Sequence, residues 1–206
     1  MTHGDDSGLV LPPSVAPIQV VVIPVQQHKE GVLEGATKIY ETLKAAGIRA
    51  KLDDSDQSPG WKFSEYEMKG VPLRIEIGPR DLAEEKCVIV RRDNRQKSFV
   101  AISDLIEETK KGLSDLANAI YEKALENRKN RTWTATTLDE LKTIANEKSG
   151  YIRAMWCGDV ECEMKLKEEA DVSSRCIPFG DNEPCSDTCV CCGRAAKKLV
   201  YWGKAY

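Results

Sequence analysis

The sequence has few of the residues that build a hydrolytic centre. It contains only two histidines, His3 and His28, and neither lies near a serine or cysteine in a nucleophile pattern. We therefore expect both histidines to lie on the surface. No Gly-x-Gly-x-x-Gly or Gly-x-x-x-x-Gly-Lys string follows the first strand-like run, so a nucleotide-phosphate loop is not predicted either.

Long apolar runs and an excess of positive charge are also lacking. The chain has 206 residues, of which 41% are hydrophobic, and these are too scattered for a membrane span. No basic region followed by an apolar run marks a secretory signal, so a soluble protein of the cytosol is expected. The formal net charge of -3 argues against binding nucleic acid by bulk attraction. Any RNA contact must come from a local group of side chains.

The acidic loop at residues 53–59 lacks the parts of a calcium site. It is dense in carboxylates, but it has neither the central glycine nor the closing glutamate of an EF-hand. We interpret it as a solvated turn. The glycine- and proline-rich segment at residues 1–17 is interpreted as an extended connector.

The first half of the chain predicts an α/β fold. Residues 18–25 form a nearly continuous β-branched run, which is typical of a strand buried on both faces. Apolar residues then recur at helical spacing from Val32 to Leu43, Gly47 is placed to end that helix, and residues 48–52 read as a strand. Such a β-α-β unit favours parallel pairing with a right-handed crossover.

The most informative stretch is residues 60–81. A short helix is predicted to start at Pro59 or Gly60 and to end at Gly70, and a strand opens at Pro72. The side chains of the strand that can face a core are Leu73, Ile75 and Ile77.

The other side of that strand carries charge. Arg74 and Glu76 share this face, Arg80 lies just past the strand end, and Glu67 lies on the preceding helix. One interpretation is that these side chains only decorate a solvated face. The other is that fixed elements hold two guanidiniums and two carboxylates close together to recognise a polar, planar group.

An antiparallel hairpin is predicted next, from residues 87–92 and 97–101. Four cations crowd its tip: Arg91, Arg92, Arg95 and Lys97. They could protect a sheet edge from aggregation or could contact phosphates, and the sequence leaves both interpretations open.

A long helical pattern from Ser103 fades at residues 128–131, where the first domain is expected to end. Thr137 followed by Glu140 predicts a capping box at the start of another helix, and residues 151–156 read as a strand. A second α/β unit is therefore expected to begin near Thr132.

Seven of the eight cysteines lie between Cys157 and Cys192, while Cys87 reads as a small core residue. Disulfides are disfavoured in a reducing compartment, so a metal is the better interpretation. Cys157 and Cys162 form one expected ligand pair, and Cys189 and Cys192 form the other.

Four thiolates make a closed tetrahedral site, which suits structural rather than catalytic zinc. Cys191 in place of Cys192 is the alternative fourth ligand. Cys176 is expected to be a core strand residue.

The charged stretch carries a family resemblance. The string Gly-Trp-Lys-Phe, followed by Glu-x-Lys-Gly-Val-Pro-x-Arg-x-Glu-x-Gly-Pro-Arg-Asp, resembles the anticodon-binding domain of prolyl-tRNA synthetase, a class II aminoacyl-tRNA synthetase. The start of the chain, from His3 to Pro13, resembles that family's exit from the catalytic domain. The cysteine-rich tail ending in Tyr206 resembles the C-terminal zinc domain of the archaeal and eukaryotic type.

The resemblance implies a fold and a domain order. The fold is α/β, with a mixed five-stranded sheet flanked by helices and a smaller α/β zinc-binding C-terminal domain. The expected boundaries are residues 1–17 for a connector, 18–131 for the anticodon-binding domain and 132–206 for the zinc-binding domain.

The resemblance also implies a function: a ligase of translation that joins proline to its tRNA with ATP. Glu67, Arg74 and Arg80 match the family's residues that read anticodon guanines. The implied partners are the anticodon stem-loop of proline tRNA and the catalytic domain, toward which the family directs its terminal tyrosine. Neither DNA nor a membrane is an expected partner.

The family's ATP-holding arginine lies upstream of His-Gly-Asp-Asp. The catalytic core, with its ATP and magnesium, is therefore expected to be missing here, and the chain alone should be inactive. The alternative hypothesis is a stand-alone RNA-binding or scaffold protein with the same fold and no ligase activity.

Overall fold

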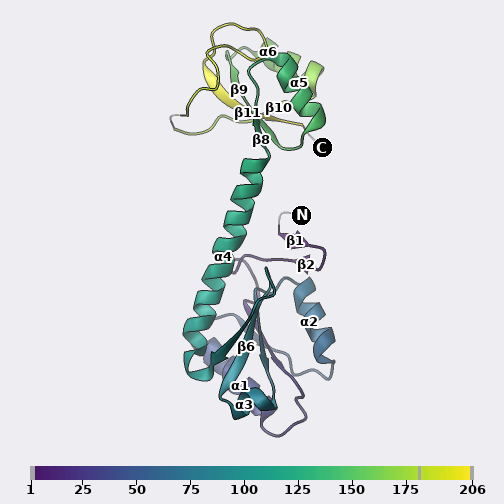
Figure 1. Ribbon diagram of the computed structural model, residues 1–206, viewed down its shortest axis with the longest axis vertical. Coiled ribbons are helices and arrows are strands. Elements are labelled where there is room, and N and C mark those ends of the chain that lie inside the picture. The colour runs from purple at the N-terminus through teal and green to yellow at the C-terminus, as the bar shows by residue number, and fades with distance from the viewer. Residues whose placement is uncertain (1–2, 181, 205–206) are drawn as a thin grey trace. The chain divides into compact units, whose positions relative to one another are not determined.

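The computed structural model describes residues 3–180 and 182–204. The chain divides into two compact units, Met1–Ala124 and Leu125–Tyr206, and each is described by itself (Figure 1).

The first unit is built on a five-stranded mixed sheet with the strand order β4-β3-β5-β6-β7. Parallel pairing joins β3 to both β4 and β5, while β6 and β7 continue the sheet in antiparallel fashion. This confirms the predicted fold class. The strands are β3 (Val20–Pro24), β4 (Ala50–Leu52), β5 (Leu73–Ile77), β6 (Lys86–Arg91) and β7 (Lys97–Ala101).

Helices cover the two faces of this sheet unequally. The main core lies between the sheet and two helices, α1 and α4, and the predicted core residues Leu73, Ile75 and Ile77 are fully buried in it. On the opposite face α2 covers only part of the sheet, through a small cluster around Val21 and Tyr66. The helices of this unit are α1 (Val32–Ala45), α2 (Pro59–Met68), α3 (Pro79–Ala83) and the 3-10 turn η1 (Ile102–Asp104), and α4 (Leu105–Asn130) begins in it.

The first turn of α2 has a side-chain cap and carries a buried ion pair. Ser58 caps the helix by accepting a hydrogen bond from the Trp61 backbone, and Pro59 occupies the first turn. Lys62 is buried, with its ammonium 3.6 Å from the carboxylate of Asp53 and donating to the Asp53 carbonyl at 2.9 Å. Because a buried ammonium is stable only with such partners, Asp53 belongs to the interior. The expectation of a fully solvated turn at residues 53–59 is wrong for this residue.

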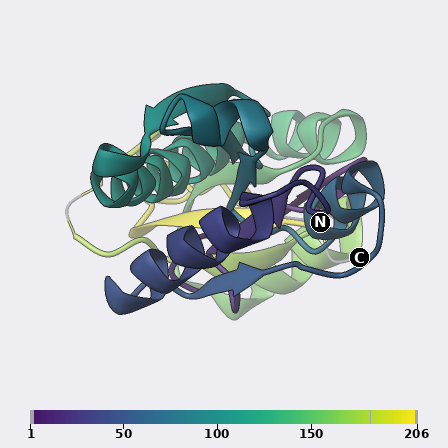
Figure 2. The same ribbon diagram turned by 90° about the horizontal axis from the view of Figure 1, so that it is seen from below.

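The N-terminal segment is folded rather than extended. It forms a two-stranded hairpin, β1 (Gly4–Asp5) and β2 (Gly8–Leu9), which both views place beside the end of α2 (Figures 1 and 2). Gly8 has φ +128°, and a Cβ there would lie 2.5 Å from the Met68 Cα. Only glycine allows two backbones to approach so closely.

The second unit has a four-stranded sheet with the order β10-β11-β9-β8. Its strands are β8 (Thr132–Thr134), β9 (Tyr151–Trp156), β10 (Ser173–Cys176) and β11 (Lys198–Gly203), and its helices are α5 (Leu138–Glu147) and α6 (Val160–Ala170). The capping box at the start of α5 is confirmed, because Thr137 and Glu140 exchange hydrogen bonds. The core of this unit surrounds the fully buried Trp202.

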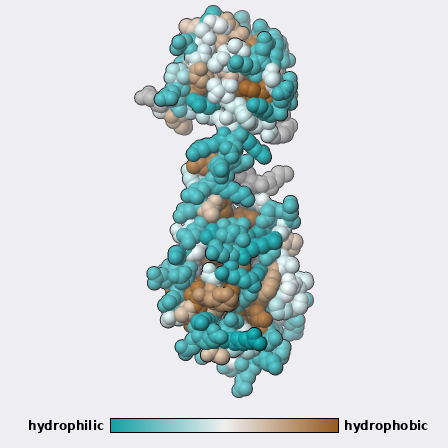
Figure 3. Space-filling view, viewed as in Figure 1, coloured by the Kyte–Doolittle hydropathy of each residue, from teal (hydrophilic) through white to brown (hydrophobic). Residues whose placement is uncertain are grey.

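Helix α4 crosses the boundary between the units. Its last fully buried side chain is that of Leu116, and the remaining turns expose mainly polar residues, as the hydrophilic surface along the helix shows (Figure 3). The division into compact units falls within this helix, between Ala124 and Leu125, and the expected boundary at 131 follows the end of the helix. No helix within the described part of the chain is long and apolar enough to cross a membrane.

Candidate functional site

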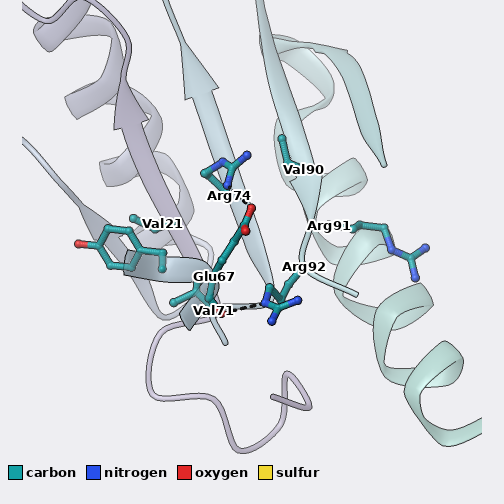
Figure 4. Close-up of a pocket in the computed structure, with 8 residues that line it drawn as sticks. Val21, Glu67, Val71, Arg74, Val90, Arg91 and Arg92 are labelled. Atoms are coloured by element: carbon teal, nitrogen blue, oxygen red, sulfur yellow. Dashed lines mark hydrogen bonds and ion pairs between the residues drawn. The ribbon is translucent and has the colours of Figure 1, made fainter. Parts of the chain in front are cut away.

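A compact charged group lies on the α2 face of the first sheet, and we call Glu67, Arg74 and Glu76 the charged triad. Arg74 Nε donates to Glu76 at 2.9 Å, and Arg74 Nη1 donates to Glu67 at 3.2 Å. The guanidinium carbon also lies 4.0 Å from the centre of the Phe63 ring. The planar cation is thus stacked on one side and bound by carboxylates at its edge. Figure 4 shows Arg74 beside Glu67.

The triad borders a cleft that is too small for a nucleobase. The cleft is lined by the residues drawn in Figure 4 and has a volume of about 10 Å³, which is room for roughly one water molecule. A planar ligand of that size would therefore contact the triad only from outside the cleft. Glu67 is the more accessible carboxylate, because its side chain is 27% exposed against 11% for Glu76.

Behind the triad, a second pair fixes Glu67 in place. Arg92 donates to both oxygens of Asp5, at 2.8 and 2.7 Å, and its Nε donates to the Glu67 carbonyl at 2.9 Å. Arg92 is only 4% exposed. The Arg92 guanidinium holds the pKa of the Asp5 carboxyl well below its usual range. The contact joins the N-terminal hairpin, the end of α2 and the residue that follows β6 into one support.

The four cations of the β6–β7 hairpin do not form one free patch. Arg92 is committed to Asp5, and Arg91 donates to both oxygens of Asp93 at 3.0 and 2.7 Å. The other two face solvent more: Arg95 lies 3.8 Å from Glu67, and Lys97 lies 3.5 Å from Glu76. Of the four cations, only Arg95 and Lys97 are therefore left to protect the sheet edge or to contact phosphates.

Arg80 lies apart from the triad. It is exposed on α3, beyond the end of β5, whereas Arg74 is the second residue of that strand. Within residues 3–180 and 182–204, no hydrogen bond or ion pair joins Arg80 to Glu67, Arg74 or Glu76. The expected group of two guanidiniums and two carboxylates is thus assembled only as the triad.

Four cysteines of the second unit converge. The Sγ atoms of Cys157, Cys162, Cys189 and Cys192 all lie within 4.8 Å of one another, and we call this group the cysteine cluster. Cys157 follows β9, Cys162 lies in the first turn of α6, and a tight turn at residues 188–195 supplies the other two. Among the described residues Cys191 is not part of this group.

The spacing of the sulfurs fits a tetrahedral metal site. The Sγ atom of Cys157 lies 3.7 Å from that of Cys162 and 3.9 Å from that of Cys192. Thiolates around zinc, with bonds of about 2.3 Å, would stand about 3.8 Å apart. The cluster therefore forms a possible metal-binding site compatible with structural zinc.

Arg194 supplies the positive charge beside this cluster. Its Nε donates to Cys192 Sγ at 3.3 Å, and its Nη2 donates to Asp159 at 2.7 Å. This hydrogen bond lowers the pKa of the Cys192 thiol to about 6, whereas burial raises the pKa of Cys162. The exposed edge of the cluster thus already favours a thiolate.

Comparison with known proteins covers both units. Residues 19–112 match the family model described as an anticodon binding domain, and residues 138–206 match the one described as prolyl-tRNA synthetase, C-terminal. The proline–tRNA ligases of Ruminiclostridium cellulolyticum and Lachnospira eligens are each 55% identical to the chain over 206 residues, and that of Clostridium botulinum (strain Loch Maree) is 54% identical. Each alignment covers 100% of this chain.

The chain matches the C-terminal part of prolyl-tRNA synthetases. It spans 43% of the length of these relatives. All of them are bacterial, so the lineage suggested by the archaeal and eukaryotic type receives no support from them. The segment that matches the anticodon binding domain contains the charged triad. The segment that matches the C-terminal model contains the cysteine cluster.

The two expectations for cysteines outside the cluster have different outcomes. Cys87 is fully buried in the first core, as predicted, and burial raises the pKa of its thiol to about 11. The expectation for Cys176 is wrong, because β10 lies at a sheet edge and leaves this side chain exposed. The expected role of Tyr206 falls outside the described residues.

Two parts of the site escaped the sequence analysis. Nothing in the sequence indicates that Asp5 and Arg92 meet, since 87 residues separate them. Phe63 has no expected role, although its position four residues before Glu67 places both side chains on one face of α2. That spacing was the available signal for the stacked guanidinium.

Proposed function

We propose that the first unit reads the anticodon of a proline tRNA, as the C-terminal part of a proline–tRNA ligase. The observation that carries this proposal is Arg74 held between two carboxylates and stacked on Phe63. The match to an anticodon-binding family supports it. The ligase activity itself belongs to whole relatives that are more than twice as long as this chain.

Guanine suits this arrangement chemically. Its N7 and O6 accept hydrogen bonds from an arginine, and its N1 and N2 protons are donated to a carboxylate. We assign Arg74 and Glu67 to one anticodon guanine, because they share a hydrogen bond and both line the cleft. Arg80 is assigned to a different nucleotide, since it is exposed on α3 and makes no contact with the triad.

The four clustered cysteines are proposed to bind one zinc ion. Four thiolates leave no position for water, so the ion would hold the fold together and would not act in catalysis. It would join the end of β9, the first turn of α6 and the turn at residues 188–195, which together supply the four cysteines.

The remaining assignments concern the whole enzyme. We propose that activation of proline with ATP and magnesium occurs in a catalytic domain that partners this chain, and that the protein works in the cytoplasm. The archaeal and eukaryotic type would then describe a domain layout that bacteria also use, because the matched C-terminal domain is present in bacterial relatives.

Binding of an anticodon stem-loop tests the proposal. The full chain should bind a proline tRNA stem-loop in preference to one with adenines in place of the anticodon guanines. Arg74→Ala should weaken binding by about 1 to 3 kcal/mol and reduce that preference. Lys38→Ala on α1 is the control, because it removes one positive charge from the opposite layer.

Fluorescence anisotropy at one fixed salt concentration measures the binding of each of the three proteins to each of the two stem-loops. Equal binding of the two stem-loops by the unmodified chain would contradict anticodon reading. Equal losses of affinity from Arg74→Ala and Lys38→Ala would instead show that the RNA does not bind at the triad.

A further inference from the structure

The pairing register arranges the side chains on the triad face in two rows. In each row the residues lie directly opposite one another on β3, β5, β6 and β7. The first row is Val21, Arg74, Val90 and Lys97, and the second is Ile23, Glu76, Val88 and Phe99. The triad face therefore extends past β5 to the edge strand β7.

Phe99 is the exposed end of the second row. Its side chain is 73% exposed, whereas Val88 directly opposite it is buried. Helix α2 packs on β3 and does not extend over β7, so the Phe99 ring presents one aromatic surface to solvent. An exposed aromatic ring on a sheet has a packing partner elsewhere in many binding proteins, because leaving it in water forgoes the gain from burial.

The surroundings of Phe99 identify the class of partner. Lys97 lies two residues earlier on the same face and is paired with Glu76 at 3.5 Å, and Arg95 lies at the adjoining hairpin tip. One aromatic ring beside cations is the composition of a surface that binds single-stranded nucleic acid. A protein-docking surface would instead show a contiguous apolar patch.

The distance between Glu76 and Phe99 along the second row determines what Phe99 can contact. Two strand spacings separate Glu76 from Phe99, which is about 10 Å. This spacing leaves room for one base on Phe99 beside the base bound by Arg74. The base on Phe99 would then belong to another unpaired nucleotide of the same loop.

We propose that the Phe99 ring stacks on one unpaired base of an RNA loop, while a different base of the same loop contacts Arg74. This inference rests on the proposed function. It adds to the triad, which reads hydrogen-bonding groups, a surface that recognises the flat side of a neighbouring base.

The first experiment compares variants of Phe99 in the full chain. Phe99→Ala should weaken binding of the proline anticodon stem-loop by about 5-fold or more, as expected for loss of one stacked base. Phe99→Tyr should restore binding, and Phe99→Leu, which keeps apolar bulk without an aromatic face, should not. Phe179→Ala is the matched control, because Phe179 is fully exposed in the other unit. Thermal unfolding verifies that each variant is folded.

The second experiment identifies the base. A set of stem-loops, each with one loop base removed, is titrated with the unmodified chain and with Phe99→Ala. At one position, base removal should weaken the unmodified chain but cause no further loss in Phe99→Ala. Additive losses at every position would overturn the stacking proposal.

The two proposals fail in distinguishable ways. If Arg74→Ala loses affinity while Phe99→Ala binds as the unmodified chain does, the role of Phe99 is overturned and anticodon reading stands. If the unmodified chain binds no stem-loop, both are overturned.

Discussion

The charged triad and the cysteine cluster satisfy their polar groups in opposite ways. Arg74 has two carboxylates and an aromatic ring from its own unit, so the triad is complete without a ligand. The cluster brings four thiols together with Arg194 at only one edge. Four thiolates repel one another unless a cation lies among them. The first unit should therefore fold by itself, whereas the second should need metal.

The largest expected effect follows from removing a cluster ligand. Cys157→Ser should unfold the second unit or lower its stability strongly, since structural zinc contributes on the order of 10 kcal/mol in small domains. The first unit should keep its own unfolding transition. Elemental analysis for zinc and calorimetry measure both effects.

Cys176→Ser is the matched control for that experiment. Cys176 is exposed and lies outside the cluster, so this substitution should change neither zinc content nor stability. A folded second unit without bound metal would remove the contrast between the two regions.

A smaller effect is expected from the support behind the triad. Arg92→Ala leaves Asp5 and the Glu67 carbonyl without their donor, and we expect the first unit to lose roughly 2 to 3 kcal/mol, less than for a fully buried pair because Asp5 is partly exposed. Arg91→Ala should cost less, because the Arg91 side chain is more exposed than that of Arg92 and its hydrogen-bond partner Asp93 lies only two residues away. The urea unfolding midpoint of the first unit is measured for both variants. Equal midpoints for Arg92→Ala and Arg91→Ala would contradict a structural role for Arg92.

The salt dependence of RNA binding sharpens the distinction between reading and attraction. Arg95→Ala should reduce the slope of log affinity against log salt by about one, because its exposed guanidinium is available to a phosphate. Arg74→Ala should leave that slope nearly unchanged while lowering discrimination between bases. Titrations at three salt concentrations measure the slopes, and interchanged effects would reverse the two assignments.

The smallest expected effect is on acid stability. The pKa of Asp5 is lowered by hydrogen bonds from Arg92, and the pKa of Asp53 is also lowered, because hydrogen bonds from Ser55 and the charge of Lys62 outweigh burial. Stability from depressed carboxyl pKa values is present above the unfolded value near 3.9 and is lost as pH falls through the folded value. The contribution of these two carboxyls to the stability of the first unit should therefore be constant from pH 8 to about 5 and should decrease below that pH.

Asp5→Asn isolates one carboxyl in that experiment. It should be less stable at neutral pH and should lose less stability on acidification than the unmodified chain. Chemical denaturation at pH 7 and pH 3.5 gives the two differences, and an unchanged acid loss would show that Asp5 does not contribute.

Local sequence signals predicted the elements that local physics determines. The β-branched run of β3, the helical spacing of α1 and the capping box of Thr137 each involve residues a few positions apart, and each is confirmed. Alternation correctly gave the two faces of β5 because one face is buried by helices. The same alternation failed at Cys176, since an edge strand has no second buried face.

Long-range pairing escaped sequence analysis for a physical reason. Lys62 and Arg92 look like surface cations in any local window, and only the fold provides Asp53 and Asp5 as partners. The separation of Arg80 from Arg74 likewise depends on where α3 begins after β5. Residue types predicted the chemistry of the site, but the choice of partners required the tertiary structure.

The contact between Asp5 and Arg92 has a consequence for the order of folding. It joins the beginning of the chain to the last hairpin of the first unit, so its loop can close only after the intervening strands have paired. We expect it to be absent from the folding transition state. Arg92→Ala should then accelerate unfolding several-fold with little change in the folding rate, as stopped-flow kinetics in urea would measure. A slower folding rate would instead place the N-terminal hairpin in the folding nucleus.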